Sequence, residues 1–382
     1  MPPKAPAFDL RIQEALQSVL DRGEKGVSVA VYYHGKLIIN AFAGEKDVAT
    51  KAPTDERTLF SIFSVTKGIT ALAVHLQAER GLLRLEDPIA KHWPEFGVNG
   101  KHGITIQQVL SHRSGIPQMP TGVTPELMAD WDWMVQQIAN FTPVYPPGKA
   151  NVYHVLVWGW ILGEVVRRTD PQQRSFGQFM TDELCTPLGI TDDLFLGVPD
   201  SELGRVATLY GGNKMLFEDQ HGTSPPSVFP GSDVHNLKIV QQTIDPGAGA
   251  IGTATAIARV FAMIAEGGEL DGVRLFSPER VRSFLRFREG AYDADELLPF
   301  PTWFGAAGFW LGGEPGASDP LVGTHREIVY SPGAGGSIAW ADIKQRISVA
   351  ICHNNMDVAL QTDPEPIWAP IGRAIQEVLS EQ

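Results

Sequence analysis

The stretch Phe63-Ser64-Val65-Thr66-Lys67-Gly68 lies near the end of the first sixth of the chain, and the rest of the sequence is best understood from it. The apolar run 58–63 before it is expected to approach as a buried extended segment. After it, apolar residues recur at positions 69, 72, 73 and 76, which is the spacing of one buried helix face. Ser64 is therefore predicted at a helix start, where free backbone N–H groups and the helix dipole favour negative charge.

Lys67 follows Ser64 by three residues, so both side chains emerge on the same side of the predicted helix. A serine hydroxyl is a weak nucleophile until another group takes its proton, and a desolvated lysine can do this. An ordinary N-cap serine followed by a surface lysine would look the same, and an S-x-x-K pattern arises by chance about once in such a chain. The interpretation as nucleophile and base therefore depends on the other motifs.

The composition narrows the classes of function. The chain has 382 residues, of which 43% are hydrophobic, and this is enough for a large core. The net charge of -13 argues against nucleic acid and against a basic membrane-binding patch. Neither an apolar signal sequence nor an apolar run of transmembrane length is found, so a soluble cytoplasmic protein is expected. The sequence does not indicate an oligomeric state.

Two distant cysteines, Cys185 and Cys352, are expected to be buried small apolar side chains. They do not form a disulfide framework, and no Cys/His spacing indicates zinc. The sequence therefore predicts neither a metal nor a cofactor.

The pattern of elements predicts an α/β (α+β) fold. The β-rich runs 27–33 and 36–42 flank His34-Gly35 as a hairpin, and 337–342 with 347–352 form another. Helices are expected at 8–20 and 366–379, so one antiparallel sheet is built from both termini and flanked by helices. Residues 1–60 and 241–382 are predicted to form this discontinuous domain. Residues 61–240 are predicted to form a helical domain, with the active site at the junction.

Further elements are expected between these ends. Short helices are predicted over 105–112, capped by Thr105, over 253–266, capped by Thr253, and over 277–287. One continuous helix is expected over 127–139, and another is expected to open at Tyr153 and continue to residue 166. Residues 303–311 are predicted to be a strand. The Gly- and Pro-rich segment 205–233 is expected to form loops around a pocket.

A serine–lysine pair also needs a second proton-transfer group, an oxyanion donor and a wall that fixes the substrate. Tyr153 is the candidate for proton transfer, because it follows the turn 147–148 and its hydroxyl is expected to project from a helix start. Beside an ammonium group the pKa of this phenol is expected to fall, and burial is expected to lower the pKa of the lysine. A half-buried core tyrosine would give the same sequence pattern.

The segment Tyr330-Ser331-Pro332-Gly333-Ala334-Gly335-Gly336-Ser337 is the candidate for the other supports. Its glycines let a sheet edge approach a ligand closely, and one of its N–H groups, with that of Ser64, would hold a developing oxyanion. A glycine-rich hairpin turn has the same composition. The chain contains no G-x-S-x-G elbow, P-loop, Rossmann fingerprint or H-E-x-x-H motif. Structural roles are expected for three histidines: His112, His154 and His353.

Together, the segment 64–67, Tyr153 and the segment 331–337 resemble the three motifs of the serine β-lactamase-like hydrolases. The resemblance is closest to the branch of class C β-lactamases, D-alanyl-D-alanine carboxypeptidases and family VIII carboxylesterases. Segments 81–88, 104–116 and 267–272 also look like family segments in the same order. The resemblance covers roughly residues 10–375 and implies a β-lactamase/transpeptidase-like fold without a metal or cofactor.

The resemblance also implies roles for individual residues. Ser64 would be the acylated nucleophile, Lys67 its general base, and Tyr153 the group that carries protons to the leaving group and from water. The N–H groups of Ser64 and Ala334 would form the oxyanion hole, with Ser331 and Gly333 on the same substrate-binding wall.

Two positions depart from the family pattern. The family motif Y-x-N is Tyr153-His154-Val155 here, so the asparagine that contacts the amide of β-lactams and peptides is missing. Ser331 stands where the family has Lys or His, which removes a group that recognises a substrate carboxylate. Both changes favour neutral, apolar esters. Four tryptophans are candidates to line such a pocket: Trp131, Trp133, Trp158 and Trp310.

The leading hypothesis is a serine hydrolase that cleaves carboxylic esters through an acyl-enzyme, so the expected partner is a small ester or acyl substrate. An acyltransferase of the lovastatin-synthesis type shares the motifs, and there an alcohol rather than water would resolve the acyl-enzyme. β-Lactamase or D-amino-acid peptidase activity is a further alternative. A protein of another class, a non-catalytic binding protein on the same fold, would not need an intact Ser64, Lys67 and Tyr153.

Overall fold

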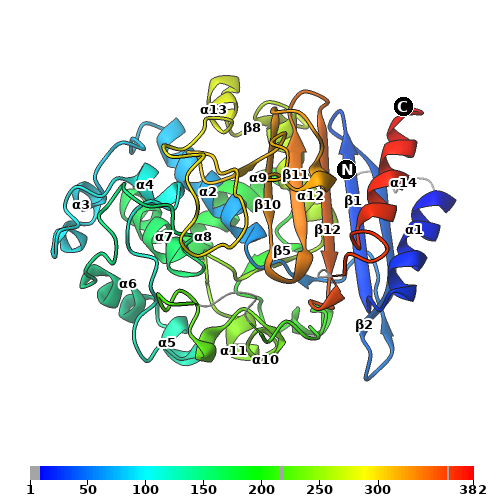
Figure 1. Ribbon diagram of the computed structural model, residues 1–382, viewed down its shortest axis with the longest axis horizontal. Helices are drawn as coiled ribbons and strands as arrows, with labels where there is room; N and C mark the ends of the chain where they lie inside the picture. Colours follow the sequence, from blue (N-terminus) through cyan, green and yellow to red (C-terminus); the bar gives the residue numbers. More distant parts are fainter. Residues whose placement is uncertain (1–8, 215–218, 359–360) are drawn as a thin grey trace.

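An antiparallel sheet forms the centre of the computed structural model, which describes residues 9–214, 219–358 and 361–382 (Figure 1). Its strand order is β3-β2-β1-β12-β11-β10-β9. Strands from the two ends of the chain meet where β1 pairs with β12, so the predicted sheet built from both termini is confirmed. The strands are β1 (Gly26–Tyr33), β2 (Lys36–Asp47), β3 (Ala52–Pro53), β9 (Trp310–Leu311), β10 (Ile328–Pro332), β11 (Ile338–Asp342) and β12 (Ile347–His353).

Helices cover both faces of this sheet. Helices α1 (Leu10–Asp21) and α14 (Ala369–Leu379) pack together over one face, and α12 (Ala254–Ala265) packs on the other (Figure 1). Successive side chains of a strand point to opposite faces, so Val29 and Val31 share a core with α1 and α14, whereas Ala30 faces the core around α12. Strand β1 is apolar apart from Ser28 because both of its faces are buried.

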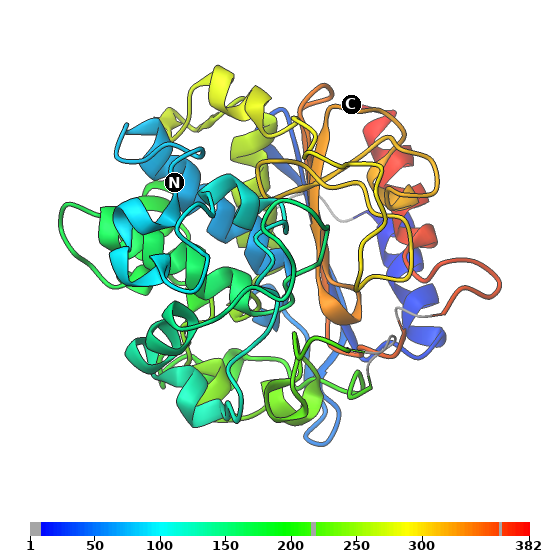
Figure 2. The ribbon, with the colours of Figure 1, turned by 60° about the vertical axis from the view of Figure 1, so that its left-hand side comes forward.

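The helical region lies beside the sheet and is organised around α2 (Val65–Glu79), on which α7 (Val157–Thr169) packs (Figure 2). Every residue of α2 from Val65 to Ala78 is buried, so this helix is enclosed on all sides rather than along one apolar face as predicted. The other helices are α3 (Ile89–His92), α4 (Ile106–Leu110), α5 (Pro125–Ala129), α6 (Trp131–Ala139), α8 (Phe176–Met180), α9 (Thr186–Leu188), α10 (Ser232–His235), α11 (Lys238–Gln241) and α13 (Pro278–Ser283). Short strands complete the fold: β4 (Phe60–Ser61), β5 (Leu194–Leu196), β6 (Ala250–Gly252), β7 (Glu269–Leu270) and β8 (Val273–Arg274).

Three predicted elements differ in the structure. The helix predicted over 127–139 is interrupted at Asp130, which has extended backbone angles and caps α6 through its side chain on the Trp133 N–H. The helix after Tyr153 begins only at Val157. In the predicted strand 303–311 only residues 310–311 pair with the sheet, because Gly308 has a φ of +93° and turns the chain.

The predicted caps are confirmed. Thr105 forms a capping box with Gln108 at the start of α4, and Thr253 caps α12. Helix α13 starts as expected, after its Ser277 cap, but ends at Ser283 rather than at residue 287. The first helix starts at Leu10, and Phe8 of the predicted range lies outside the described residues.

Both cysteines are buried and unpaired, as expected for small apolar side chains. Among the residues that the structure describes, none of the helices combines the length and the apolar character needed to cross a bilayer.

Candidate active site

Ser64 stands at the N-cap position of α2, as predicted, but its side chain makes no capping bond to the helix. Its Oγ instead lies 2.9 Å from Lys67 Nζ. Phe63, just before it, has a φ of +46°, a left-handed conformation that is strained for a bulky residue. The Phe63 ring is buried with Leu209 and Met356, and this packing holds the turn that presents the Ser64 hydroxyl.

Lys67 is almost completely buried, with 2% of its surface exposed. Its Nζ donates to the carbonyl oxygens of Val155 and Gly247, at 2.7 and 2.9 Å. Burial lowers the pKa of Lys67 to about 7, against an opposing attraction from Asp245. A neutral amine has two N–H bonds for the two carbonyls and one lone pair left for the Ser64 hydroxyl. The geometry therefore allows Lys67 to take the proton of Ser64.

Asp245 is a buried carboxylate behind this pair, and no motif in the sequence points to it. Its Oδ1 accepts the N–H groups of Gly247 at 2.7 Å and Ala248 at 3.2 Å. Its Oδ2 is buried and has no hydrogen-bond partner in the described part of the chain. Burial raises the pKa of Asp245, and Lys67 is the cation that opposes this shift. The carboxylate thus fixes the turn that presents the Gly247 carbonyl to Lys67.

The turn at Gly247 comes very close to α7. A Cβ atom on Gly159 would lie 2.1 Å from the Gly247 nitrogen, so only glycine permits this approach. Thr70 of α2 holds the same turn by donating to the Pro246 carbonyl at 2.8 Å. Two helices therefore set the position of one of the Lys67 partners.

Tyr153 lies on an irregular segment before α7, and the Ser64 side chain is the group that opposes the effect of burial on the pKa of its hydroxyl. Its ring centroid is 5.1 Å from Lys67 Nζ. Burial raises the pKa of Tyr153, so the predicted decrease is wrong. The reason is that burial penalises the phenolate and that Lys67, with its lowered pKa, carries only part of a charge at neutral pH. Tyr153 therefore keeps its proton and can donate it.

The Tyr153 segment is held by buried polar groups. The Tyr153 N–H donates to Asp295 Oδ1 at 3.1 Å, and the His154 N–H donates to His112 Nδ1 at 2.9 Å. The His112 ring packs on the Tyr153 ring with 4.5 Å between centroids. Burial lowers the pKa of His112 and that of His154, so both are neutral at neutral pH. His353 lies elsewhere, beside Glu24.

The third motif meets Ser64 along β10. Ser331 Oγ donates to the Ser64 carbonyl at 2.8 Å, so this hydroxyl holds the backbone of Ser64. A Cβ on Gly333 would lie 2.4 Å from the Ile62 carbonyl, which explains the glycine there. Ala334 follows and is exposed. Among the described residues, no hydrogen bond occupies the N–H of Ala334 or that of Ser64.

The candidate tryptophans are dispersed. Trp310 contacts Tyr153 with 6.2 Å between ring centroids. Trp158 stacks on His112 but is itself fully buried. Trp131 donates to Glu164 at 2.9 Å within the helical region, and Trp133 is half-buried on α6. The structure therefore brings Trp310 to the Tyr153 side of the site.

Known proteins share this architecture over most of the chain. A protein-family model described as Beta-lactamase matches residues 8–368. Esterase/beta-lactamase LipL of Mycobacterium tuberculosis (strain ATCC 25618 / H37Rv) is 30% identical over 348 residues, which are 87% of this chain and 77% of that protein. A solved family VIII carboxylesterase has a TM-score of 0.86 at 28% identity and 98% coverage of both chains. A penicillin-binding protein homologue from Caulobacter crescentus has a TM-score of 0.80 at 30% identity, covering 92% of this chain and 93% of its own.

The matched range contains each residue of the site, from Ser64 to Ala334. The relatives described as an esterase/beta-lactamase and a carboxylesterase are hydrolases. The buried lysine beside a serine hydroxyl in this chain is consistent with the same class of enzyme. The chain is a serine hydrolase and belongs to the beta-lactamase family.

Proposed function

We propose that this protein hydrolyses carboxylic esters through an acyl-enzyme on Ser64. The observation that carries the proposal is the environment of Lys67, whose nitrogen has two carbonyl acceptors and the Ser64 hydroxyl as its neighbours. With a pKa lowered to about 7, roughly half of these amines are neutral at neutral pH. An unburied lysine would be neutral in well under about one molecule in a thousand.

Acylation follows from this arrangement. The Ser64 Oγ attacks the acyl carbon, and its proton passes to Lys67 Nζ. The negative charge that develops on the carbonyl oxygen is held by the N–H groups of Ser64 and Ala334. The C–O bond to the alcohol then breaks and leaves the acyl group on Ser64.

Tyr153 serves the leaving group. Its buried phenol keeps its proton at neutral pH, so it can protonate the departing alkoxide. The Tyr153 phenolate then recovers a proton from the Lys67 ammonium group. A water molecule then attacks the acyl carbon, and Lys67 and Tyr153 carry its proton to the Ser64 Oγ. The bond between the Ser64 Oγ and the acyl carbon breaks, and the carboxylic acid leaves.

The substrate class is argued from two positions. Ser331 offers no positive charge to a substrate carboxylate, and its hydroxyl is engaged with the Ser64 carbonyl. At position 155 the backbone carbonyl binds Lys67, while the valine side chain cannot hydrogen-bond to an amide. These positions favour neutral esters over β-lactams and peptides, because an amide or carboxylate would be left without its partner.

Covalent labelling tests the nucleophile. A fluorophosphonate probe is expected to add one adduct to the wild type by intact mass, and the adduct is expected to disappear in Ser64→Ala. Ser61→Ala is the matched control, because Ser61 is also buried, lies on β4 just before the site and has an unpaired hydroxyl in the described chain. A labelled Ser64→Ala protein, or an unlabelled wild type, would contradict the proposal.

Substrate panels test the reaction. p-Nitrophenyl esters of increasing acyl length are expected to turn over with a kcat/KM far above that of nitrocefin. Product analysis with a thioester and a bulky alcohol then separates hydrolysis from acyl transfer. Free acid supports hydrolysis, whereas a new ester as main product would assign the protein to acyl transfer.

A further inference from the structure

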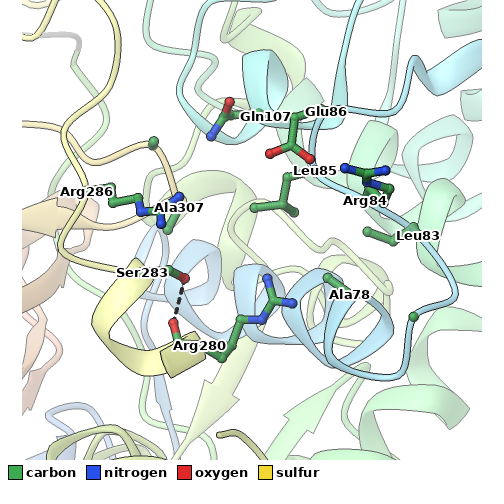
Figure 3. Close-up of a pocket in the computed structure, with 12 residues that line it drawn as sticks. Ala78, Leu83, Arg84, Leu85, Glu86, Gln107, Arg280, Ser283, Arg286 and Ala307 are labelled. Carbon is green, nitrogen blue, oxygen red and sulfur yellow. Dashed lines mark hydrogen bonds between the residues drawn. The ribbon is translucent and has the colours of Figure 1, made fainter. Parts of the chain in front are cut away.

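A cavity of about 260 Å³ opens at the far end of the nucleophile helix (Figure 3). Ala78 and Gly81, at the C-terminal end of α2, form part of its lining. Because α2 rises by about 1.5 Å per residue, this end lies roughly 20 Å along the helix from Ser64. The cavity is thus separate from the site described above.

Three arginines come to this cavity from two parts of the chain: Arg84 from one, and Arg280 and Arg286 from the other. Figure 3 shows the Arg280 guanidinium pointing into the cavity, with Arg84 and Arg286 on opposite sides and Glu86 and Gln107 across from it. Arg280 is already paired with Glu79 at 3.1 Å, outside the lining. Glu86 is the carboxylate of the lining. The cationic groups therefore outnumber the carboxylates around the cavity.

Arg84 and Arg286 differ from all other arginines of the described chain. Every other arginine has a side-chain hydrogen bond or ion pair within the residues that the structure describes. Neither guanidinium of this pair has such a partner in those residues, and both line the same cavity. The net charge of the protein is -13, so carboxylates are abundant elsewhere on the chain.

We propose that this cavity binds a small molecule through an oxyanion, either a phosphate or a carboxylate group. A guanidinium presents paired N–H donors in a fork that matches both groups. Arg84 and Arg286 supply the charge from two sides, and the Gln107 amide supplies a neutral donor between them. The volume is slightly below that of ordinary drug-sized sites, so a compact metabolite fits.

Binding of defined anions tests the proposal without reference to enzyme activity. Inorganic phosphate and succinate are titrated separately into the full chain by calorimetry at constant ionic strength, with chloride as the reference anion. Saturable binding of at least one of them is expected. Binding of phosphate alone identifies a phosphate ligand, and tighter binding of succinate identifies a carboxylate ligand.

Substitutions locate the binding. The double variant Arg84→Gln with Arg286→Gln is expected to weaken binding at least tenfold, since each lost charged hydrogen bond is worth at least that much. Arg282→Gln is the control, because Arg282 lies on α13 like Arg280 but outside the cavity lining, is exposed and pairs with Glu279. Circular dichroism confirms that each variant is folded.

Two results would overturn the proposal. One is the absence of saturable phosphate and succinate binding to the wild type. The other is equal binding by the wild type and the folded double variant, which would place the anion elsewhere.

Discussion

Replacing Asp245 with asparagine tests the electrostatics of the site most directly. The amide oxygen of Asn can still accept the N–H groups of Gly247 and Ala248, and Oδ2 has no partner in the described residues to lose. The change thus removes a charge while it keeps the shape. The negative charge of Asp245 favours the protonated form of Lys67, so its removal lowers the pKa of Lys67 below about 7.

The magnitude follows from the fraction of neutral amine. With a pKa of about 7, about a tenth of the Lys67 side chains are neutral at pH 6. Loss of a nearby opposite charge shifts a pKa by at least about one unit. A decrease of this size in the pKa of Lys67 makes about half of the Lys67 side chains neutral at pH 6. The kcat/KM at pH 6, expressed relative to its plateau, is therefore expected to rise about fivefold.

The assay is kcat/KM for a p-nitrophenyl ester across the pH range, together with the pH dependence of fluorophosphonate labelling. Apart from Asp245 itself, whose pKa burial raises to about 6, the titratable groups packed around Lys67 keep their charge near neutral pH, because burial lowers the pKa of His112 and His154 and raises that of Tyr153. The acid limb of both profiles should move to lower pH in Asp245→Asn. An acid limb that stays in place, or that moves to higher pH, would refute the reasoning.

A control separates the local charge from a general effect of removing a buried carboxylate. Asp319 is also largely buried with a raised pKa, and its Oδ1 accepts the Leu321 N–H at 2.9 Å, away from Lys67. Asp319→Asn should leave the acid limb unchanged. A shift of equal size in this variant would show that the effect is not specific to Asp245.

Three further changes address the groups around Ser64. Tyr153→Phe keeps the ring packing but removes the proton donor, so kcat is expected to fall about 10²–10⁴-fold in the ester assay with little change in Tm. Ser331→Ala removes one of the two donors of the Ser64 carbonyl, which keeps the Lys67 N–H, and urea denaturation should show a loss of about 0.5–1.5 kcal/mol; an unchanged midpoint would contradict the role of this bond. Gly159→Ala pushes on the Gly247 turn and should reduce kcat about tenfold or more, whereas Gly103→Ala, with open space around its Cβ, should not.

Local patterns in the sequence predicted much of the fold. The hairpin around His34-Gly35 and the caps Thr105 and Thr253 depend on residues within a few positions of each other, and the structure confirms them. The break at Asp130 was missed because the apolar spacing continues across it. The Asp130 side chain accepts a backbone N–H as an N-cap and so starts a new helix. The periodicity of the flanking residues does not reveal this effect.

The site residues that belong to short sequence motifs could be predicted. The contacts that distant backbone groups make with them could not. Ser64 and Lys67 are three residues apart, so a helix places them together. The partners of Lys67 are carbonyl oxygens of Val155 and Gly247, and a carbonyl is present at every position of any sequence. Asp245 is likewise recruited by tertiary packing. The direction of the Tyr153 pKa was mispredicted because burial, which the sequence does not display, outweighs the nearby amine.

The pairing of β1 with β12 has a consequence for biosynthesis. Val29 lies opposite Ile351. The first strand that the ribosome makes therefore cannot pair with β12 until the end of the chain has been synthesised. At about 5–20 residues per second, the N-terminal hairpin has an unpaired edge for roughly tens of seconds. An open strand edge is a template for wrong association. The sheet can therefore close only after translation is nearly finished, and the yield of folded enzyme should depend on protection of the nascent hairpin by chaperones.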